Sequence, residues 1–285
     1  MAEPTPLKPL EAGLYVVSTP IGNLRDITLR ALDVLARADV VLAEDTRVCG
    51  KLLSAHGVKN RVERYDDHTG ERARPQILER LALGQRIALT TDAGTPLVSD
   101  PGFRLVQEAA RAGLPVFPVP GASAALAALT AAGLPTDRFL FAGFSPHKSG
   151  PRRSFLESLK GVQATLVLYE SGPRLADSLA DMAAVFGPRE AAVCRELTKL
   201  HETTYRGTLD TLAADPRLDG PRGEIVVVIG PPLEAAAAMP EAVDAALTDA
   251  LLSMGPAEAA SQVSRLLDQP RKALYRRALE LKGAV

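Results

Sequence analysis

The chain has 285 residues and a formal net charge of −1, which argues against a surface that is cationic throughout and built for nucleic acid. With 46% hydrophobic and 24% charged residues it is too apolar for a disordered protein, and it has only 12 Phe and Tyr and no Trp to offer as base-stacking platforms. Its two cysteines, Cys49 and Cys194, are far apart, which excludes a disulfide scaffold and favours a reducing cytoplasm.

In the first half of the chain, short β-rich runs alternate with helical patterns, which is typical of βα units around a parallel sheet. Strands are expected at residues 14–18, 39–43, 62–65, 86–91 and 115–119. Helices are expected at residues 28–38, 72–83 and 101–112, the last with Asp100 as its cap and Pro101 at its first position.

Residues 112–136 carry no charge and are numerous enough to span a bilayer. Pro115, Pro118 and Pro120 divide them into a strand, a turn and an Ala-rich helix, so we expect no membrane segment. The N-terminus has neither the basic nor the apolar region of a signal peptide. A cytoplasmic location is therefore expected.

The second half of the chain repeats the βα theme. Strands are expected at residues 139–142, 165–169, 191–194, 203–206 and 224–229. The apolar run 225–229 indicates a strand buried on both faces. Three helices are expected after it, at residues 241–253, 256–267 and 270–282. We therefore predict an N-terminal α/β domain (1–120), a second α/β domain (121–232) and a helical, partly basic extension (233–285).

Three predicted loops at strand ends, residues 18–26, 91–102 and 119–124, are rich in Gly and Pro. Open α/β sheets bind ligands at the carboxyl ends of their strands, where glycines allow close approach to the backbone. No Lys or Arg lies at the centre of these loops, so a neutral or zwitterionic nucleoside suits them better than a phosphate. The alternative is that Gly and Pro merely form the βα turns.

A fourth segment, Glu44-Asp45-Thr46-Arg47, follows the strand at 39–43. Its carboxylates could orient a hydroxyl or accept a proton. Equally, Glu44 or Asp45 could cap the next helix and pair with Arg47. The chain has no GxxxxGK[ST] or HExxH motif, and we predict no metal site.

Read together, these segments resemble the bacterial family that methylates a cytidine ribose 2′-oxygen in 16S ribosomal RNA, a branch of the tetrapyrrole-methylase superfamily. The signatures are STPIGNLRDIT (18–28), AEDTR (43–47), DAGTP (92–96) with DPG (100–102), YES (169–171) and RELTK (195–199). The resemblance covers residues 14–230, and this branch also carries a helical C-terminal extension.

The resemblance implies S-adenosylmethionine as methyl donor, bound in a cleft between two α/β domains, in a homodimer that acts on 16S RNA within the small ribosomal subunit. By position, the donor is expected to contact Pro20, Asp92, Ala93, Gly94, Leu97, Ser123 and Ala124 of the N-terminal loops, and Glu170 and Gly207 of the second domain.

For catalysis we expect Asp45 to act as the base or to orient the ribose, with Glu44 as second candidate, and Arg47 to hold an RNA phosphate. Further RNA contacts are expected from Lys148, Arg152 and Arg153 and from the tail 256–285, whose six basic and three acidic residues give it a charge of about +3. The alternatives are a methyltransferase for a tetrapyrrole or other small molecule, and a non-catalytic RNA- or nucleotide-binding module.

Overall fold

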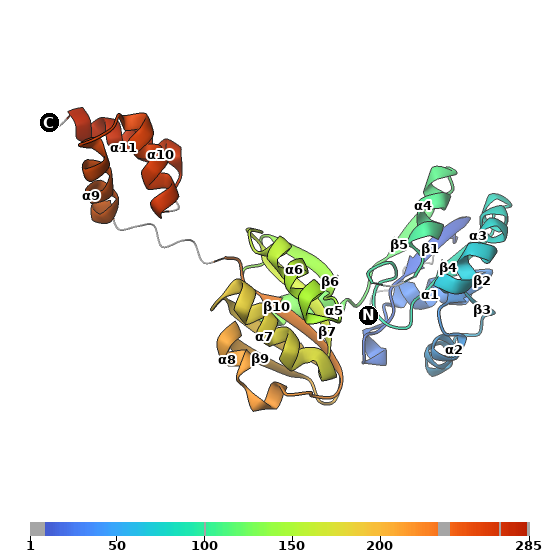
Figure 1. The fold of residues 1–285 in the computed structure, drawn as a ribbon. Helices are drawn as coiled ribbons and strands as arrows, with labels where there is room; N and C mark the ends of the chain where they lie inside the picture. The colour runs from blue at the N-terminus through green and yellow to red at the C-terminus, as the bar shows by residue number, and fades with distance from the viewer. Residues whose placement is uncertain (1–8, 100, 233–239, 268, 284–285) are drawn as a thin grey trace, which may run out of the picture. The chain divides into compact units, whose positions relative to one another are not determined.

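A computed structural model describes residues 9–99, 101–232, 240–267 and 269–283. The chain forms two compact units, Met1–Gly230 and Pro231–Val285. Both β-sheets belong to the first unit (Figure 1). The division of that unit at residues 120 and 121 into two domains stays a prediction.

The first sheet is fully parallel, as its βα pattern predicts. It contains β1 (Gly13–Val17), β2 (Val40–Ala43), β3 (Val62–Arg64), β4 (Arg86–Leu89) and β5 (Val116–Val119). Their order is β3-β2-β4-β1-β5. Because every strand runs the same way, the loops that follow β2, β4, β1 and β5 leave the sheet at one edge.

Helices cover both faces of this sheet. They are α1 (Leu29–Arg37), α2 (Thr46–Ala55), α3 (Asp67–Ala82) and α4 (Phe103–Arg111), with a 3₁₀ turn, η1, at Leu24–Asp26. One apolar cluster joins the sheet to α1 and α2, and another joins it to α3 and α4. The expectation that Pro101 starts a helix is wrong: Gly102 adopts a left-handed conformation (φ 115°), so the helix begins only at Phe103. Asp100, its predicted cap, lies outside the described residues.

The second sheet is mixed, which corrects the parallel theme expected there. It contains β6 (Phe139–Phe144), β7 (Thr165–Ser171), β8 (Glu190–Arg195), β9 (Thr203–Thr208) and β10 (Glu224–Ile229), in the order β6-β7-β10-β8-β9. Only β6 and β7 pair in parallel. The loop 196–202 between β8 and β9 is too short for the crossover that a parallel pair needs, so these strands form a hairpin.

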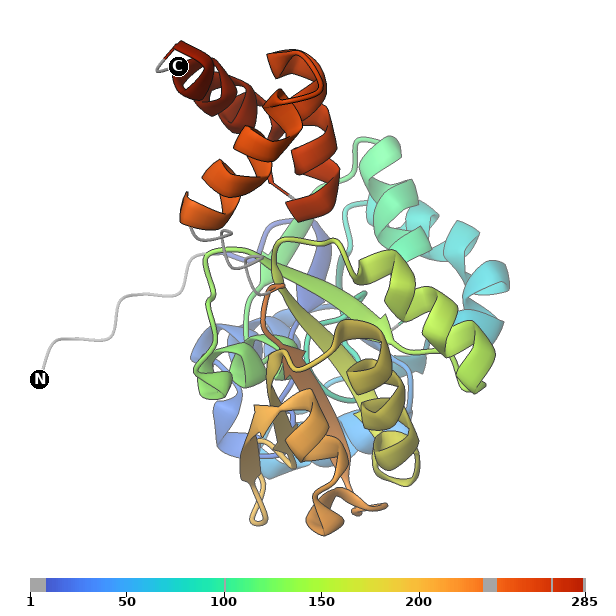
Figure 2. The same cartoon turned by 60° about the vertical axis from the view of Figure 1, so that its left-hand side comes forward.

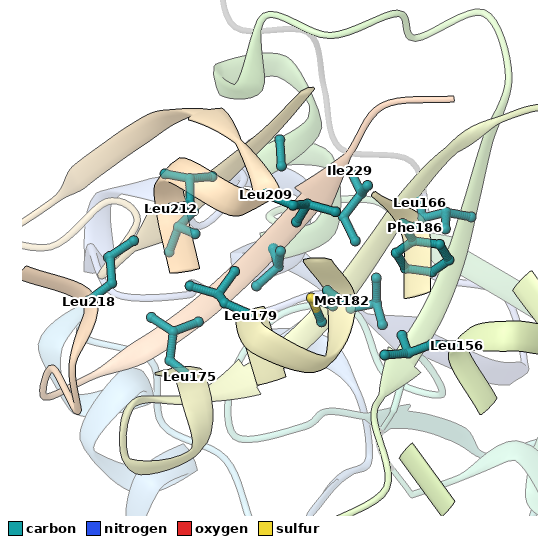
Figure 3. Packing of buried hydrophobic residues seen from close by; sticks show 14 of the residues in the cluster. Leu156, Leu166, Leu175, Leu179, Met182, Phe186, Leu209, Leu212, Leu218 and Ile229 are labelled. Carbon is teal, nitrogen blue, oxygen red and sulfur yellow. The ribbon is translucent and has the colours of Figure 1, made fainter. Parts of the chain in front are cut away.

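The central strand β10 is buried on both faces, as its apolar run predicts. Ile225, Val227 and Ile229 face α6 (Ser149–Leu159), α7 (Leu175–Phe186) and α8 (Leu209–Ala213). In Figure 3, Leu179 and Met182 of α7 lie over the sheet on the same side as Ile229. Val226 and Val228 face α5 (Ala124–Ala132) on the other side. Short 3₁₀ turns, η2 (Gly172–Arg174) and η3 (Pro216–Leu218), complete this half.

The second compact unit is a bundle of three helices, α9 (Pro240–Leu251), α10 (Pro256–Leu267) and α11 (Arg271–Gly283). Figure 2 shows them in orange to red, packed on one another. Their core consists of small and branched apolar side chains, namely Leu247, Ala250, Ala259, Ala260, Val263, Leu274 and Ala278. The three helices expected after the last strand are thus confirmed.

No helix in the described part of the chain is both long enough and apolar enough to cross a bilayer. The uncharged segment 112–136 divides as predicted, with β5 followed by α5 after a turn.

Candidate functional site

The three Gly- and Pro-rich loops meet at the carboxyl edge of the first sheet. Thr19 and Gly94 exchange two backbone hydrogen bonds, with N···O distances of 2.8 and 3.1 Å. The Ser18 hydroxyl donates to Thr95 Oγ1 (3.1 Å), and the Thr95 hydroxyl donates to the carbonyl oxygen of Ala122 (3.2 Å). Residues from all three loops are therefore held together by direct hydrogen bonds.

These loops form one side of a cavity of about 310 Å³, a volume typical of small-molecule sites. The second sheet and its loops form the other side. The lining residues of the first half and of α5 are Ile21, Ala93, Gly94, Thr95, Val98, Ser99, Ser123 and Ala124. Those of the second sheet and its loops are Phe144, Tyr169, Glu170, Ser171, Cys194, Leu197, Gly223, Glu224, Ile225 and Val226.

The only charged side chains among these lining residues are two carboxylates, Glu170 and Glu224. Glu170 is buried and accepts hydrogen bonds from the hydroxyls of Ser145 (2.9 Å) and Ser178 (2.6 Å) and from the backbone N–H of Ser171 (2.8 Å). The Arg174 guanidinium also lies 3.3 Å from this carboxylate and partly offsets its charge. The described lining residues therefore offer no Lys or Arg side chain to a phosphate.

Glu224 belongs to a second cluster, at the loop between β8 and β9. The Lys199 ammonium lies 3.0 Å from Glu224 and 2.9 Å from Glu196. Burial alone would lower the pKa of Lys199, but its hydrogen bonds to the two carboxylates raise the pKa above its usual value. Lys199 therefore stays protonated and partly offsets the charge of Glu224.

The loop after β1 reaches across to this β8–β9 loop. Ile21 packs into the apolar cluster beneath α5, and Leu197 belongs to the same cluster. At Gly22 a Cβ atom would lie only 2.4 Å from the Lys199 side chain and 2.8 Å from Thr198 Oγ1. A glycine is needed there because the two loops are too close for a side chain. This contact helps to fix the cavity walls relative to one another.

Five of the nine residues expected to contact the donor line the cavity, namely Ala93, Gly94, Ser123, Ala124 and Glu170. The other four do not. Pro20 is buried next to Ile21, and Leu97 packs against the α3 and α4 side of the first sheet. Gly207 pairs with Ala191 on β8, three residues from the cavity-lining Cys194.

Asp92 is exposed and connects the cavity edge to the Glu44–Arg47 segment, because its carboxylate accepts a hydrogen bond from the backbone N–H of Asp45 (3.1 Å). Sequence reasoning missed most of the lining from the second sheet, including Phe144, Cys194 and Val226. The YES signature marks the end of β7 and the RELTK signature marks the loop after β8, but nothing in the sequence shows which strand residues face the cavity.

In the structure Asp45 caps the following helix and pairs with Arg47, which is the second of the two roles expected from the sequence. Its carboxylate accepts a hydrogen bond from the Arg47 backbone N–H (2.8 Å), caps α2 and pairs with the Arg47 guanidinium at 2.6 Å. These hydrogen bonds from Arg47 hold the pKa of Asp45 well below its usual range. Asp215 and Arg217 form the same arrangement far along the chain, with the same 2.6 Å ion pair. The Asp-x-Arg geometry is therefore a local structural motif, and only the link to Asp92 distinguishes Asp45.

The expectation that Arg152 contacts RNA is wrong. Arg152 is buried and donates to Asp181 Oδ2 at 2.6 Å, while Arg153 donates to Asp181 Oδ1 at 2.6 Å. The Ser149 hydroxyl also donates to this carboxylate. Arg152 therefore holds α6 against α7. Lys148 is exposed.

Comparison with known proteins agrees with this architecture. The model of the family "Tetrapyrrole (Corrin/Porphyrin) Methylases" matches residues 13–213, and that of the "RsmI C-terminal HTH domain" matches residues 237–282. A crystal structure of uroporphyrin-III-C-methyltransferase from Thermus thermophilus is 26% identical, with a TM-score of 0.54, and the match covers 77% of this chain and 94% of that one.

Two relatives match along almost their whole length. Both are named ribosomal RNA small subunit methyltransferase I. The protein from Mesorhizobium japonicum is 52% identical over 97% of this chain and 95% of its own. That from Escherichia coli is 43% identical over 95% of this chain and 96% of its own. The chain therefore belongs to the tetrapyrrole methylases and, within them, to the family of ribosomal RNA small subunit methyltransferase I.

Proposed function

We propose that the protein transfers a methyl group from S-adenosylmethionine to the ribose 2′-oxygen of a cytidine in 16S ribosomal RNA, in the cytoplasm. Family membership supports a methyltransferase for small-subunit RNA. The observation that carries the proposal is the cavity, which the predicted donor loops line together with the second sheet.

The cavity residues fit the donor chemically. S-adenosylmethionine carries a sulfonium and an ammonium cation, and the described lining residues include no Lys or Arg. The two lining carboxylates, Glu170 and Glu224, are paired with Arg174 and Lys199 outside the lining, so the cavity is close to neutral. Ala93, Gly94 and Ser123 line the cavity with small or absent side chains, which leaves room for an adenosine close to the backbone. The aromatic rings of Phe144 and Tyr169, 5.4 Å apart and edge to face, supply an apolar wall for a planar base. The proposal keeps Pro20, Asp92, Leu97 and Gly207 as donor-binding candidates outside this lining.

A bound donor supplies an activated methyl group, and the protein must align the 2′-oxygen with it. Alignment of two reactants can contribute several kcal/mol to lowering the barrier. The Glu44–Arg47 segment is close to the cavity, since Asp45 donates a backbone hydrogen bond to Asp92, the neighbour of Ala93. The low pKa of Asp45 makes it a weak base, so we assign it to orienting the ribose, with Glu44 as the second candidate and Arg47 as a phosphate ligand.

We also propose a homodimer as the working form. The edge strand β6 exposes Phe139 (45%) and Leu140 (36%), and α5 of the same half exposes Leu126 (51%). An unpaired edge strand with exposed apolar side chains is a surface that a second chain can cover.

Three substrates distinguish the alternatives. The protein is incubated with methyl-labelled donor and small ribosomal subunits, protein-free 16S RNA or uroporphyrinogen, and any label is mapped. We expect one labelled cytidine whose 3′-phosphodiester bond resists alkaline cleavage, because a methylated 2′-oxygen cannot attack the phosphorus. Label only on the tetrapyrrole would replace the RNA proposal with the small-molecule one. Donor binding without transfer to any of the three would favour a non-catalytic module.

Asp45→Asn tests the orienting role. Asn caps a helix about as well as Asp and has nearly the same shape, so only the charge and the ion pair to Arg47 are lost. We expect kcat for methyl transfer to fall about 100-fold, within the range for a positioned polar group, with an unchanged donor Kd.

The matched control is Asp215→Asn, which removes the same ion pair from the same capping geometry away from the cavity. This variant is expected to keep wild-type kcat. Full activity in both variants would reduce Asp45 to a helix cap.

A further inference from the structure

The helix α11 in the second compact unit presents a cationic face. Leu274 and Ala278 are buried in the core of the unit. On the exposed side lie five residues, which we call the α11 face: Arg271, Lys272, Tyr275, Arg276 and Leu279. Positions 272, 275, 276 and 279 have the spacing of neighbours on one helix surface. Tyr275 is 42% exposed, and it precedes Arg276 and follows Lys272 by three positions in the helix.

The cations of α11 are not equivalent. Arg277 is bound within the unit, with its guanidinium 2.6 Å from Asp244 and 2.8 Å from Glu280. These hydrogen bonds raise the pKa of Arg277 above its usual value. Arg271, Lys272 and Arg276, by contrast, form no ion pair within the part of the chain that the structure describes. The basic excess of the tail is therefore concentrated on one accessible surface.

We infer that the α11 face binds the phosphate backbone of the substrate RNA, with Tyr275 against an unpaired base. This inference rests on the proposed function for its choice of RNA. The three exposed cations lie along one helix and can each contact a phosphate of the RNA backbone. Such binding is driven by release of the counterions that surround the phosphates. An exposed aromatic ring among cations is what single-stranded segments use for stacking.

The test is a full-length triple variant, Arg271→Gln, Lys272→Gln and Arg276→Gln. The affinity for small ribosomal subunits is measured at assay salt concentrations from about 50 to about 300 mM. Each lost phosphate contact removes about 0.7 from the slope of log K against log salt, so the slope should fall by about 2 and affinity by about 100-fold at 0.1 M. Donor affinity, measured by calorimetry, should not change, because the cavity lies in the other compact unit.

The matched control neutralises three exposed cations of the first unit that also have no ion pair among the described residues, by Lys59→Gln, Arg111→Gln and Arg138→Gln. It carries the same change in net charge and should keep the wild-type slope. An equal loss of affinity for the subunits in both variants would mean that only the overall charge matters, and it would overturn the inference. An unchanged slope of log K against log salt in the α11 variant would overturn it as well.

Tyr275→Ala separates stacking from electrostatics. We expect lower affinity for small ribosomal subunits, by about 10-fold, with an unchanged salt slope, because no phosphate contact is lost.

Vesicles of phosphatidylglycerol serve as a second probe. If the triple variant loses affinity for the vesicles but not for the subunits, the α11 face binds membranes and the inference is overturned. A methyl-transfer assay runs in parallel: transfer without an α11 effect overturns this inference alone, and an α11 effect on RNA without transfer overturns the proposed activity alone.

Discussion

Gly94→Leu is expected to weaken donor binding at least 100-fold. Gly94 lines the cavity, and its backbone is tied to Thr19 by two hydrogen bonds, so it cannot move away. A Cβ atom at this position would already lie 3.5 Å from Ile21 on the same wall. The rest of a leucine side chain would occupy space that the proposed donor needs. Calorimetry with S-adenosylmethionine measures the effect directly.

The control for this experiment is Gly113→Leu. Both glycines have a positive φ, 85° at Gly94 and 70° at Gly113, so both substitutions strain the backbone by about 1–2 kcal/mol. Gly113 is exposed, and a Cβ atom there would meet nothing within 4 Å. We expect Gly113→Leu to lower the Tm slightly and to leave donor affinity unchanged. Equal donor affinity in the two variants would move the donor out of this cavity.

Asp181→Asn is expected to destabilise the first compact unit by roughly 3 kcal/mol, as removal of one partner from a buried ion pair does. The side chains of Asp181 and Arg152 are each only 4% exposed, and the substitution leaves the Arg152 guanidinium buried without a counter-charge. Denaturant unfolding measures the loss. Asp215→Asn, at an equally short ion pair whose Arg217 side chain is 69% exposed, should cost much less because water can solvate the arginine that remains.

The effect of Asp181→Asn should depend on pH. Burial alone would raise the pKa of Asp181, but hydrogen bonds from Arg153, Arg152 and Ser149 outweigh it and lower the pKa below the usual value. A carboxyl with a lowered native pKa contributes stability above its unfolded pKa, near 3.9, and loses it as the pH falls through the native value. The difference between wild type and variant should therefore be complete at pH 7 and narrow below about pH 4. A constant difference down to pH 2 would contradict this account.

Several features of the fold could be predicted from local sequence alone. The strands β1 to β5 were expected because apolar runs separated by helical periodicity produce βα units. The burial of β10 on both faces follows from its uninterrupted run of Ile and Val. In the second sheet, by contrast, strand direction was predicted wrongly, because periodicity indicates a strand but not the direction of its neighbour. That direction depends on the short β8–β9 connection and on pairing between strands distant in sequence.

The candidate site, like the fold, has features that local sequence predicts and features that depend on tertiary contacts. The sequence by itself determined which loops of the first sheet line the cavity, since Gly- and Pro-rich segments at the ends of parallel strands meet at one edge whatever the details of packing. Only the tertiary structure decided which residues face the cavity. It also shows that Arg152 forms a buried ion pair with Asp181 and that Arg271, Lys272 and Arg276 of α11 are exposed. These properties depend on partners brought from distant parts of the chain or from neighbouring helices. The near-zero net charge shows the difference, because it conceals both a buried ion pair and an exposed cationic helix.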